Sequence, residues 1–372
     1  AVLNTLDGNT SGTIDATAVT TLTGAAADLI TAYASAGISN LGNEAVSVSS
    51  GTASTSQANT LAAATSGIVT ATISDGDLAT LAGLTETGNA YSITISDNSV
   101  DAAALNTLDG KTTVAIDATA ITTLTGAAAD LNTAYASAGI SNLGDEAITL
   151  SDTSLTAAVL NTLDGNTSGT IDATAITTLT GAAADLITAY DSAGISNLGD
   201  EAITLSDTSL TAAVLNTLDG NTSGTIDATA VTTLTGAAAD LITAYASAGI
   251  SNLGNEAVSV SSGTASTSQA NTLAAATSGI VTATISDGDL ATLAGLTETG
   301  NAYSITISDN SVDAAALNTL DGKTTVAIDA TAITTLTGAA ADLNTAYASA
   351  GISNLGDEAI TLSDTSLTAA VL

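Results

Sequence analysis

The strongest constraint on this chain of 372 residues is internal repetition without any change of sequence. Residues 1–160 recur unaltered as residues 213–372, so that residues 1–212 form the larger repeat unit. Shorter repeats are marked by the string LNTLDG, which begins at Leu3, Leu105, Leu160, Leu215 and Leu317. A single short repeat cannot bury an apolar face, whereas stacked copies bury one continuous core. We therefore expect residues 1–372 to form one continuous repeat array.

Both ends of the array lie inside a repeat. Ala1 begins, and Leu372 stops, within the same Leu-rich stretch, and neither end carries a polar capping repeat. Solenoid proteins generally need such caps to stay soluble. We therefore expect the chain to be an excerpt of a longer protein, in which case a targeting signal would not be found in it.

Each repeat contains a short segment in which apolar and small polar residues alternate with period two, the pattern of a β-strand. These segments occupy residues 46–49, 69–73, 91–95, 148–151 and 203–206. A polar corner and an Ala/Leu-rich stretch follow, as in residues 155–163. Ser or Thr before that stretch predicts a helix N-cap, and Gly165 after it predicts the end of the helix.

A longer helix is predicted over residues 181–190. Ala183, Leu186, Ile187 and Tyr190 have the spacing of one helix face, and Gly194 follows as a stop signal. Elements of about 32 residues therefore alternate with elements of about 22 to 24 residues, and about 14 elements fill the chain.

These units predict a mainly β fold, namely a parallel β-solenoid of about 14 stacked coils, many with a short Ala/Leu-rich helix. Strands of neighbouring coils would pair in parallel at about 4.8 Å. The absence of Pro fits this fold, because Pro removes a hydrogen-bond donor from a central strand. A leucine-rich-repeat-like α/β solenoid is the alternative, although the pattern L-x-x-L-x-L-x-x-N is not present as such.

Composition excludes several classes of function. The chain has 37 acidic residues, only two basic residues (Lys111 and Lys323), a net charge of −35, and neither His nor Cys. Zinc, haem, iron–sulfur and thiol chemistry are therefore excluded. Without basic residues, nucleic acid and anionic membrane surfaces are poor partners. No apolar run reaches the ~18 residues that a membrane-spanning helix needs, so we expect no membrane insertion.

Catalysis is not expected. Enzymes built on β-solenoids gather carboxylates and basic residues on one face, whereas this chain has no His or Arg and one Lys in each copy of the larger repeat unit. Equivalent residues also recur in each copy, whereas an active site is usually unique. We therefore expect neither an enzyme nor a required cofactor.

Calcium is the metal for which the sequence offers ligands. The string DGNTSGTID resembles the start of an EF-hand loop, with oxygen ligands at positions 1, 3, 5 and 9 and Gly at position 6. The candidate ligands are Asp7, Asn9, Ser11 and Asp15, then Asp164, Asn166, Ser168 and Asp172, and finally Asp219, Asn221, Ser223 and Asp227. Position 12 is Ala175 instead of Glu, and Lys111 replaces a ligand in the copy at Asp109. A helix C-cap with a polar turn is the alternative interpretation.

A second acidic set lies at the corners between elements. Its members are Asp75, Asp97, Asp152 and Asp207, which each follow a strand, and Asp145-Glu146 and Asp200-Glu201, which precede one. If corners stack, two like charges at about 5 Å cost about 3 kcal/mol at an effective dielectric constant of ~20. Either divalent cations bridge these carboxylates, or salt screens a solvated acidic face whose carboxylates also cap helices.

The strand segments also predict outward ladders of Thr and Ser. If Val69, Ala71 and Ile73 point inward, Thr70 and Thr72 point outward. Such a face can order water, as in ice-binding solenoids, or make lateral contacts between molecules. The β-propensity of Thr explains the pattern equally well.

The strings LTGAAADLITAY, ISNLGDEAITLSDTSL and LNTLDGNTSGTIDA resemble repeats of giant, weakly basic cell-surface proteins of marine bacteria, especially cyanobacteria. Those proteins are often described as β-strand-repeat or calcium-binding-like. The resemblance covers the whole chain. It implies an extracellular or cell-surface location and a structural or adhesive role, and it implies no catalytic residues. The calcium-binding nonapeptide G-G-x-G-x-D of β-rolls is absent.

The sequence thus predicts a stiff acidic rod that serves as an extracellular fibre, a stalk or part of a surface layer. Sequence-identical units suit head-to-tail self-association into filaments, a contact that does not close on itself. Divalent cations are expected as optional partners. The alternative is an adhesin or an ice-binding module that uses the outward Thr and Ser ladders.

Overall fold

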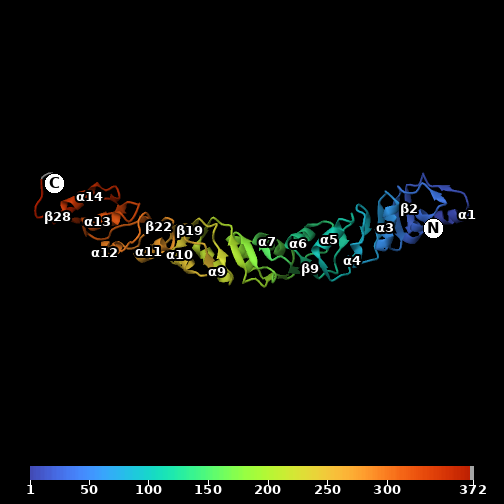
Figure 1. Ribbon diagram of the computed structural model, residues 1–372, viewed down its shortest axis with the longest axis horizontal. Coiled ribbons are helices and arrows are strands. Elements are labelled where there is room, and N and C mark those ends of the chain that lie inside the picture. Colours follow the sequence, from blue (N-terminus) through green and yellow to red (C-terminus); the bar gives the residue numbers. More distant parts are fainter. Residues whose placement is uncertain (369–372) are drawn as a thin grey trace. The chain divides into compact units, whose positions relative to one another are not determined.

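The computed structural model describes residues 1–368 as a succession of short helices and short parallel strands (Figure 1). The chain divides into two compact units. The first consists of Ala1–Thr177 and Asp191–Leu198, and the second consists of Thr178–Tyr190 and the chain from Gly199 onward. The single array over residues 1–372 stays a prediction, and residues 369–372 of it lie outside the described residues.

Helices recur at regular intervals in the first unit. They are α1 (Val2–Asn9), α2 (Ala26–Ala34), α3 (Thr55–Ala64), α4 (Leu78–Leu81), α5 (Ala102–Asp109), α6 (Ala128–Ala136) and α7 (Ala157–Asn166). We call the chain from the start of one helix to the residue before the next a coil. The shortest coil of this unit covers residues 55–77, and the longest coils cover residues 26–54 and 128–156.

Short parallel strands join the coils of the first unit. They are β1 (Ile14–Asp15), β2 (Thr21–Ala25), β3 (Ile38–Ser39), β4 (Ala45–Ser50), β5 (Val69–Thr72), β6 (Ala90–Ser92), β7 (Ser99–Asp101), β8 (Ile116–Asp117), β9 (Thr123–Gly126), β10 (Ile140–Ser141), β11 (Ala147–Leu150), β12 (Ser154–Thr156), β13 (Ile171–Asp172) and β15 (Ile195–Ser196). Two of its sheets have the orders β2-β4-β5-β6 and β7-β9-β11-β13-β15. Neighbours in each sheet come from successive coils.

The second unit repeats this arrangement. Its helices are α8 (Ala183–Asp191, all but the last residue), α9 (Ala212–Asn221), α10 (Ala238–Ala246), α11 (Thr267–Ala276), α12 (Leu290–Leu293), α13 (Ala314–Asp321) and α14 (Ala340–Ala348). Its strands are β14 (Thr178–Gly181), β16 (Ala202–Leu205), β17 (Ser209–Thr211), β18 (Ile226–Asp227), β19 (Thr233–Ala237), β20 (Ile250–Ser251), β21 (Ala257–Ser262), β22 (Val281–Thr284), β23 (Ala302–Ser304), β24 (Ser311–Asp313), β25 (Ile328–Asp329), β26 (Thr335–Gly338), β27 (Ile352–Ser353) and β28 (Ala359–Leu362). They pair in parallel, for example in the order β17-β19-β21-β22-β23.

Strand pairing keeps the coils similar in length. Ser99 pairs with Thr123, and Thr123 pairs with Ala147, so the same length of chain separates the partners at both steps. The expected long elements of about 32 residues are wrong, because even the longest coils are shorter than this. Long and short coils differ less than expected, since each coil must match the path of the next for their strands to pair.

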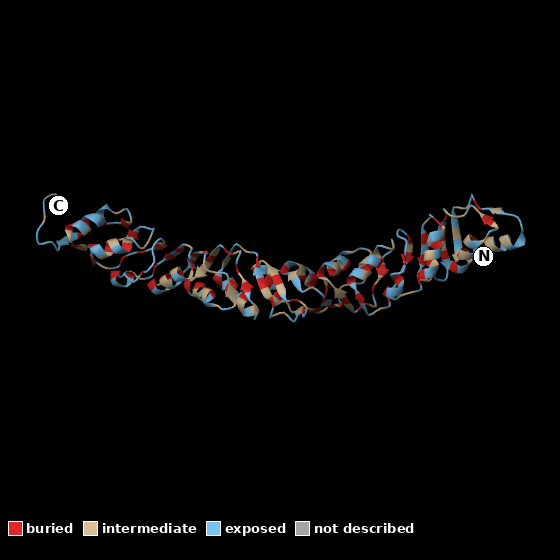
Figure 2. Ribbon diagram, viewed as in Figure 1, coloured by how far each residue is buried: buried red, intermediate tan, exposed pale blue. Residues whose placement is uncertain are grey.

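The core follows from the period of each element (Figure 2). In β5, Val69 and Ala71 are buried, whereas Thr70 and Thr72 are exposed, which confirms the predicted alternation. In α5, Ala102, Leu105 and Leu108 are buried along one helix face, and the longer helices α2, α3, α6 and α7 bury residues at the same spacing. Many buried side chains are Ala, because strands and helices of one narrow coil approach closely.

Two aromatic side chains nevertheless fit into this core. Tyr91 and Tyr303, at equivalent positions of the two copies of the larger repeat unit, are each only 1 % exposed. They are the largest fully buried side chains among the described residues. A narrow coil of this fold therefore has space for a large aromatic ring at this position.

Helix ends agree only in part with the sequence signals. A hydroxyl residue caps α7, but it is Thr156, inside the predicted stretch, and not Ser154 before it; the Thr156 side chain accepts a hydrogen bond from the backbone N–H of Val159. The helix then continues through Gly165 to Asn166, so Gly165 does not end it. Gly110 does end α5, as its C-cap. In α8, Ala183 and Leu186 are buried as predicted, whereas the third buried position is Ala189.

Repeated strand–helix units with parallel sheets make a solenoid-like α/β repeat fold. This confirms the predicted parallel pairing and stacking. The sheets of the described chain are open at their edge strands, and none closes into a barrel. No helix within residues 1–368 combines the length and the apolar character that crossing a membrane requires.

Candidate functional site: polar contacts between coils

Corner aspartates cap the helix at the start of their own coil, 19 to 24 residues earlier in the chain. The carboxylate of Asp152 accepts a hydrogen bond of 2.7 Å from the backbone N–H of Ala128, the first residue of α6. The same contact, at 2.6 to 2.7 Å, is made by Asp75, Asp97, Asp207, Asp287, Asp309 and Asp364. A carboxylate at a helix N-terminus satisfies a free N–H group and interacts favourably with the helix dipole. The structure thus confirms helix capping for the four expected aspartates that follow strands, Asp75, Asp97, Asp152 and Asp207.

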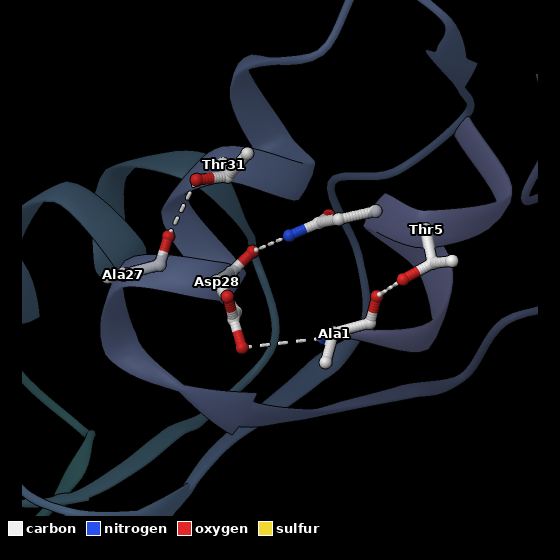
Figure 3. Close-up of polar contacts among 6 residues, drawn as sticks. Ala1, Thr5, Ala27, Asp28 and Thr31 are labelled. Carbon is white, nitrogen blue, oxygen red and sulfur yellow. Dashed lines mark hydrogen bonds and ion pairs between the residues drawn. The ribbon is translucent and has the colours of Figure 1, made fainter. Parts of the chain in front are cut away.

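Asparagines join the helices of neighbouring coils. The side-chain amide of Asn106 in α5 donates a hydrogen bond of 2.9 Å to the backbone carbonyl of Asp130 in α6. At the start of the chain, Asn4 makes the same contact with the carbonyl of Asp28, at 2.9 Å. Figure 3 shows Asp28 facing the first helix, where its carboxylate also lies 3.6 Å from the terminal amino group of Ala1. Each amide bridges the helices of two successive coils.

Five tyrosines donate to buried glutamates that lie eleven residues later in the chain. The hydroxyl of Tyr135, at the end of α6, donates a hydrogen bond of 3.0 Å to Oε2 of Glu146. Glu146 is 0 % exposed, and the backbone N–H of Gly144 donates to the same oxygen at 2.9 Å. The other pairs are Tyr33–Glu44, Tyr190–Glu201, Tyr245–Glu256 and Tyr347–Glu358.

The backbone of each buried Glu also contacts the next coil. Thr167 donates a hydrogen bond of 2.9 Å from its hydroxyl to the carbonyl oxygen of Glu146. Gly169 lies directly against that carbonyl, which leaves no space for a Cβ atom. The side chain of Glu146 therefore accepts hydrogen bonds from its own coil, while its backbone carbonyl contacts the following coil.

The electrostatics of these pairs follow from burial and hydrogen bonding. Burial raises the pKa of Tyr33 to about 12, and the hydrogen bond to Glu44 adds to this effect. Burial alone would raise the pKa of Glu44, but hydrogen bonds from Gly42, from its own backbone N–H and from Tyr33 outweigh burial and lower it. The phenol thus stays protonated as the donor, and the carboxylate stays ionised as the acceptor.

A fourth contact links aspartates at the ends of short strands to asparagines of the next coil. The Oδ1 atom of Asp172 accepts hydrogen bonds from Thr174 and, at 2.8 Å, from the side-chain amide of Asn197. Asn197 has a φ of +64°, a left-handed conformation that Asn tolerates better than most residues. Equivalent pairs are Asp15–Asn40, Asp117–Asn142, Asp227–Asn252 and Asp329–Asn354, each at 2.8 Å.

The first two candidate calcium ligands of the middle copy lie in a helix. Asp164 and Asn166 belong to α7. The carboxylate of Asp164 accepts a hydrogen bond of 2.7 Å from the hydroxyl of Ser192, and the amide of Asn166 donates one of 2.8 Å to Asn132. The string therefore starts as helix and does not start as an EF-hand loop.

The other two candidates of this copy have further partners. Ser168 lies in the turn after α7, and its hydroxyl donates to the carbonyl of Gly144 at 3.2 Å. Asp172 lies in β13 and makes the Asp–Asn pair described above. The four side chains of the middle copy are thus directed at four separate neighbours.

The other two copies show the same separation. Asp7 and Asp219 accept hydrogen bonds from Ser35 and Ser247, and Asp15 and Asp227 make Asp–Asn pairs. The remaining candidates are Asn9 at the end of α1, exposed Ser11, Ser223, which donates to Gly199, and Asn221, whose Nδ2 atom is buried without a partner. Within residues 1–368, no group of three or more Asp and Glu gathers to hold a metal ion. Calcium binding by these residues stays a prediction.

The Tyr–Glu pairs are the part of the site that sequence reasoning missed. Asp145-Glu146 and Asp200-Glu201 were both expected at the acidic corners, but only Asp145 and Asp200 are exposed, whereas both glutamates are fully buried. A signal was present, because a Tyr stands eleven residues before Glu in five copies. The signal is easily overlooked, because Glu is almost never fully buried unless it is paired and is therefore expected at the surface.

Taken together, the polar side chains that recur in this chain either join one coil to the next or hold one coil together. They provide acceptors for helix N-termini, bridges between helices and buried charge-assisted hydrogen bonds. Comparison with models of protein families, with curated proteins and with solved structures finds no match to this chain.

Proposed function

We propose that this chain is part of a structural protein, an extracellular fibre, stalk or surface layer, that carries mechanical load and catalyses no reaction. One observation carries the proposal. The same polar contacts recur coil after coil in each unit: the Asn–carbonyl and Asp–Asn contacts connect successive coils, and the helix caps and Tyr–Glu pairs hold one coil together. A protein selected for mechanical continuity would place its polar groups in this way, whereas a catalyst needs a few of them free at one site.

The finer architecture that we propose is a solenoid of about 14 coils. Fourteen helices within the described residues support that number, one for each coil. Helices of successive coils contact one another, as α5 does α6 and α13 does α14. This helical layer favours the leucine-rich-repeat-like α/β arrangement over a β-solenoid that is only decorated with helices.

Charge supports an extracellular or cell-surface location in a salty medium. The 37 acidic residues are balanced by only two lysines, which leaves a net charge of −35. In dissolved salt of about 0.15 M, charges farther apart than about 8 Å are largely screened, so an acidic surface of this kind is tolerated. The resemblance to repetitive surface proteins of marine bacteria points to the same location.

Electron microscopy of the purified chain, negatively stained at moderate salt, tests the structural role most directly. Elongated particles, whose length grows when a further copy of residues 1–212 is added by cloning, would support the proposal. Globular particles, or particles whose length does not change with the added copy, would contradict it.

The alternative is an adhesive or ice-binding role for the outward strand face. Thr72 pairs with Ser92, and Thr125 pairs with Thr149, so hydroxyl side chains lie side by side on neighbouring strands. Asp101 and Asp172 interrupt the second of these rows. A thermal hysteresis measurement checks this role, and the absence of hysteresis and of ice shaping would exclude ice binding.

Divalent cations remain proposed as optional partners of the acidic surface. Thermal unfolding in millimolar Ca²⁺ and in EDTA tests this, with Mg²⁺ as the control for simple screening. A melting temperature that rises only with Ca²⁺ would support specific sites, whereas equal values in all three solutions would exclude them.

A further inference from the structure

Two sheets differ from all others in the described chain because none of their strands contains a charged residue. One is β17-β19-β21-β22-β23 of the second unit, and the other is β2-β4-β5-β6 of the first unit, whose strands have the sequences of β19, β21, β22 and β23. Every other sheet among the described residues contains at least one Asp. In a chain with a net charge of −35, each of the two units therefore carries one sheet without charge.

The outward side of each uncharged sheet presents hydroxyl groups and one large apolar side chain. We call this side the neutral face and define it in the second unit by Ser259, Ile280, Thr282, Thr284, Ala302 and Ser304. Thr282 lies between Ser259 and Ala302 on the neighbouring strands. Ile280, two residues before Thr282, is 58 % exposed, and its counterpart Ile68 in the first unit is 57 % exposed. Both isoleucines lie well inside their units, with paired strands on either side.

Comparison with another coil shows that stacking does not require these residues. The string GIVTAT around β5 corresponds to the string GTIDAT around β13, so Ile68 stands where the other coil has Thr170, and Thr70 stands where it has Asp172. Both strands nevertheless pair in parallel with the strand of the preceding coil, β5 with β4 and β13 with β11. The fold thus accepts either set. The missing charge and the exposed Ile therefore point to contact with another molecule.

We propose that the neutral face of one molecule packs against the neutral face of a second copy of this chain, so that molecules associate side by side. The contact is isologous, because both partners use the same surface. Ile68 or Ile280 supplies its apolar centre, and the surrounding Thr and Ser hydroxyls stay hydrated or pair across it. This inference rests on the proposed structural function and names the surface through which the protein would self-associate.

Charge identifies the occupant. Each copy carries a net charge of −35, and carboxylates of two copies repel one another wherever a contact brings them together. The neutral faces are the sheet surfaces at which two copies meet without opposing carboxylates. A cationic partner would instead be attracted to the sheets that carry Asp. A neutral sugar usually binds against aromatic side chains in a concave site, whereas Tyr91 and Tyr303, the aromatic residues of these two sheets, are buried on the inward side.

The size of the neutral face predicts a weak contact that depends on salt. Strand spacing and rise give four strands an area of roughly 20 Å by 13 Å. This is less than the ~800 Å² per partner of a stable interface. We therefore expect weak association that strengthens as NaCl rises, because salt screens the repulsion between the acidic surfaces around the contact. Adding a further copy of residues 1–212 adds one neutral face and should strengthen association.

Sedimentation velocity over a concentration series, in low and high NaCl, tests the contact. Thr70→Asp combined with Thr282→Asp charges both neutral faces and should weaken association at least about tenfold. This variant should fold, because β13 already carries Asp172 at the corresponding position. The control is Ala103→Asp combined with Ala315→Asp, which adds the same charge at exposed positions of α5 and α13 and should leave association within about twofold. Circular dichroism shows that each variant is folded.

A second pair of substitutions separates the apolar contribution from charge. Ile68→Thr combined with Ile280→Thr keeps both faces neutral and introduces the residue that the fold already has at Thr170, and it should weaken association about threefold or more. A wild-type chain that stays monomeric at every concentration in high salt would overturn the proposal. So would a Thr70→Asp and Thr282→Asp chain that associates as strongly as the control.

Cross-linking tests whether the contact is isologous, and the chain has no native Cys to interfere. Packed sheets lie about 10 Å apart, so a bismaleimide of about that length should join Thr282→Cys chains to one another and should not join Ala315→Cys chains. Equal yields would contradict the contact.

Other occupants of the neutral face give different results. Thermal hysteresis, or retardation of the chain in a dextran gel, that disappears in the Thr70→Asp and Thr282→Asp chain while self-association persists would assign the face to ice or to a neutral glycan and overturn the proposal. If microscopy shows elongated particles but the chains do not associate, this contact is wrong while the structural function stands. If the chains associate through this face but the particles are globular, the contact holds and the proposed function fails.

Discussion

The hydroxyl of Tyr135 and the carboxylate of Glu146 form a hydrogen bond of 3.0 Å in which the carboxylate is completely buried. Tyr135→Phe removes this donor to Oε2 and leaves the Gly144 N–H as the other. Because the acceptor is a buried charge, we expect a loss of about 1.5 to 3 kcal/mol of unfolding free energy. Urea unfolding followed by circular dichroism measures it.

Tyr91→Phe is the matched control for that change. The hydroxyl of Tyr91 is buried without a hydrogen-bond partner, so its removal should leave stability unchanged or raise it. Equal losses for both variants would show that the Tyr135–Glu146 hydrogen bond contributes nothing beyond the packing of the ring.

Part of this fold was predictable from the sequence because its period is local. Alternation in residues 69–73 and the spacing of Leu105 and Leu108 report burial directly, since a strand or helix repeats its orientation over a few residues. The parallel pairing followed from the repeats, because identical coils bury the same face.

Other features depend on the neighbouring coil and were not predictable in this way. Gly165 looks like a helix stop, yet α7 continues for one more residue. The DGNTSGTID string looks like one loop, but its side chains are directed at four separate partners. Glu146 looks like a surface charge until Tyr135 is seen to approach it. In each of the last two cases the deciding contact comes from a residue well outside the local pattern.

Substitutions at two glycines test how closely successive coils are packed. A Cβ atom on Gly169 would meet the backbone carbonyl of Glu146 in the preceding coil, and this backbone cannot rotate away. We expect Gly169→Ala to cost about 1 to 3 kcal/mol. Gly165→Ala is the control, because Gly165 lies inside α7 with open space around it and should gain up to about 1 kcal/mol from helix propensity. Chemical denaturation compares the two, and a stable Gly169→Ala chain would mean that the coils are less tightly seated.

The corner aspartates give a prediction about helix N-termini. Asp152→Ala removes the carboxylate that caps α6 from the far end of the same coil, and Ala127, the residue before α6, has no capping side chain of its own. We expect a loss of about 1 kcal/mol. Asp145→Ala, at an exposed position nearby, controls for the change of net charge. Amide hydrogen exchange should show faster exchange at the start of α6 in the first variant and not in the second.

The Asp–Asn pairs give a prediction about acid. Hydrogen bonds from the Thr17 side chain, the Asn40 amide and the Thr17 backbone lower the pKa of Asp15 to about 2, and similar bonds lower those of Asp172 and Asp227. A carboxyl whose pKa is lower in the folded chain stabilises it above the unfolded pKa of about 4. That contribution is lost as pH falls from about 4 towards 2. Urea midpoints measured across this interval should fall, and Asp172→Asn should fall less steeply than wild type. A flat profile would contradict the assignment.

One buried amide suggests a stabilising substitution. Asn166 donates from Nδ2 to Asn132, whereas Nδ2 of the equivalent Asn221 is buried without a partner. The position that corresponds to Asn132 in the coil before Asn221 is Ile187, which has no acceptor. A buried donor without a partner costs about 1 to 3 kcal/mol, so we expect Ile187→Asn to recover part of this by restoring the amide pair.

A double-mutant cycle separates pairing from packing in this last case. Asn221→Ala should also stabilise, because it removes the unpaired donor, and combining it with Ile187→Asn should cancel the benefit, since the new amide then lacks its partner. Asn132→Ile, in the first unit, is the reciprocal change and should destabilise by leaving Nδ2 of Asn166 unpaired. The cycle compares the unfolding free energies of the wild type, the two single variants and the double variant. If Ile187→Asn destabilises the chain whether or not Asn221 is present, packing of the isoleucine outweighs the amide pair.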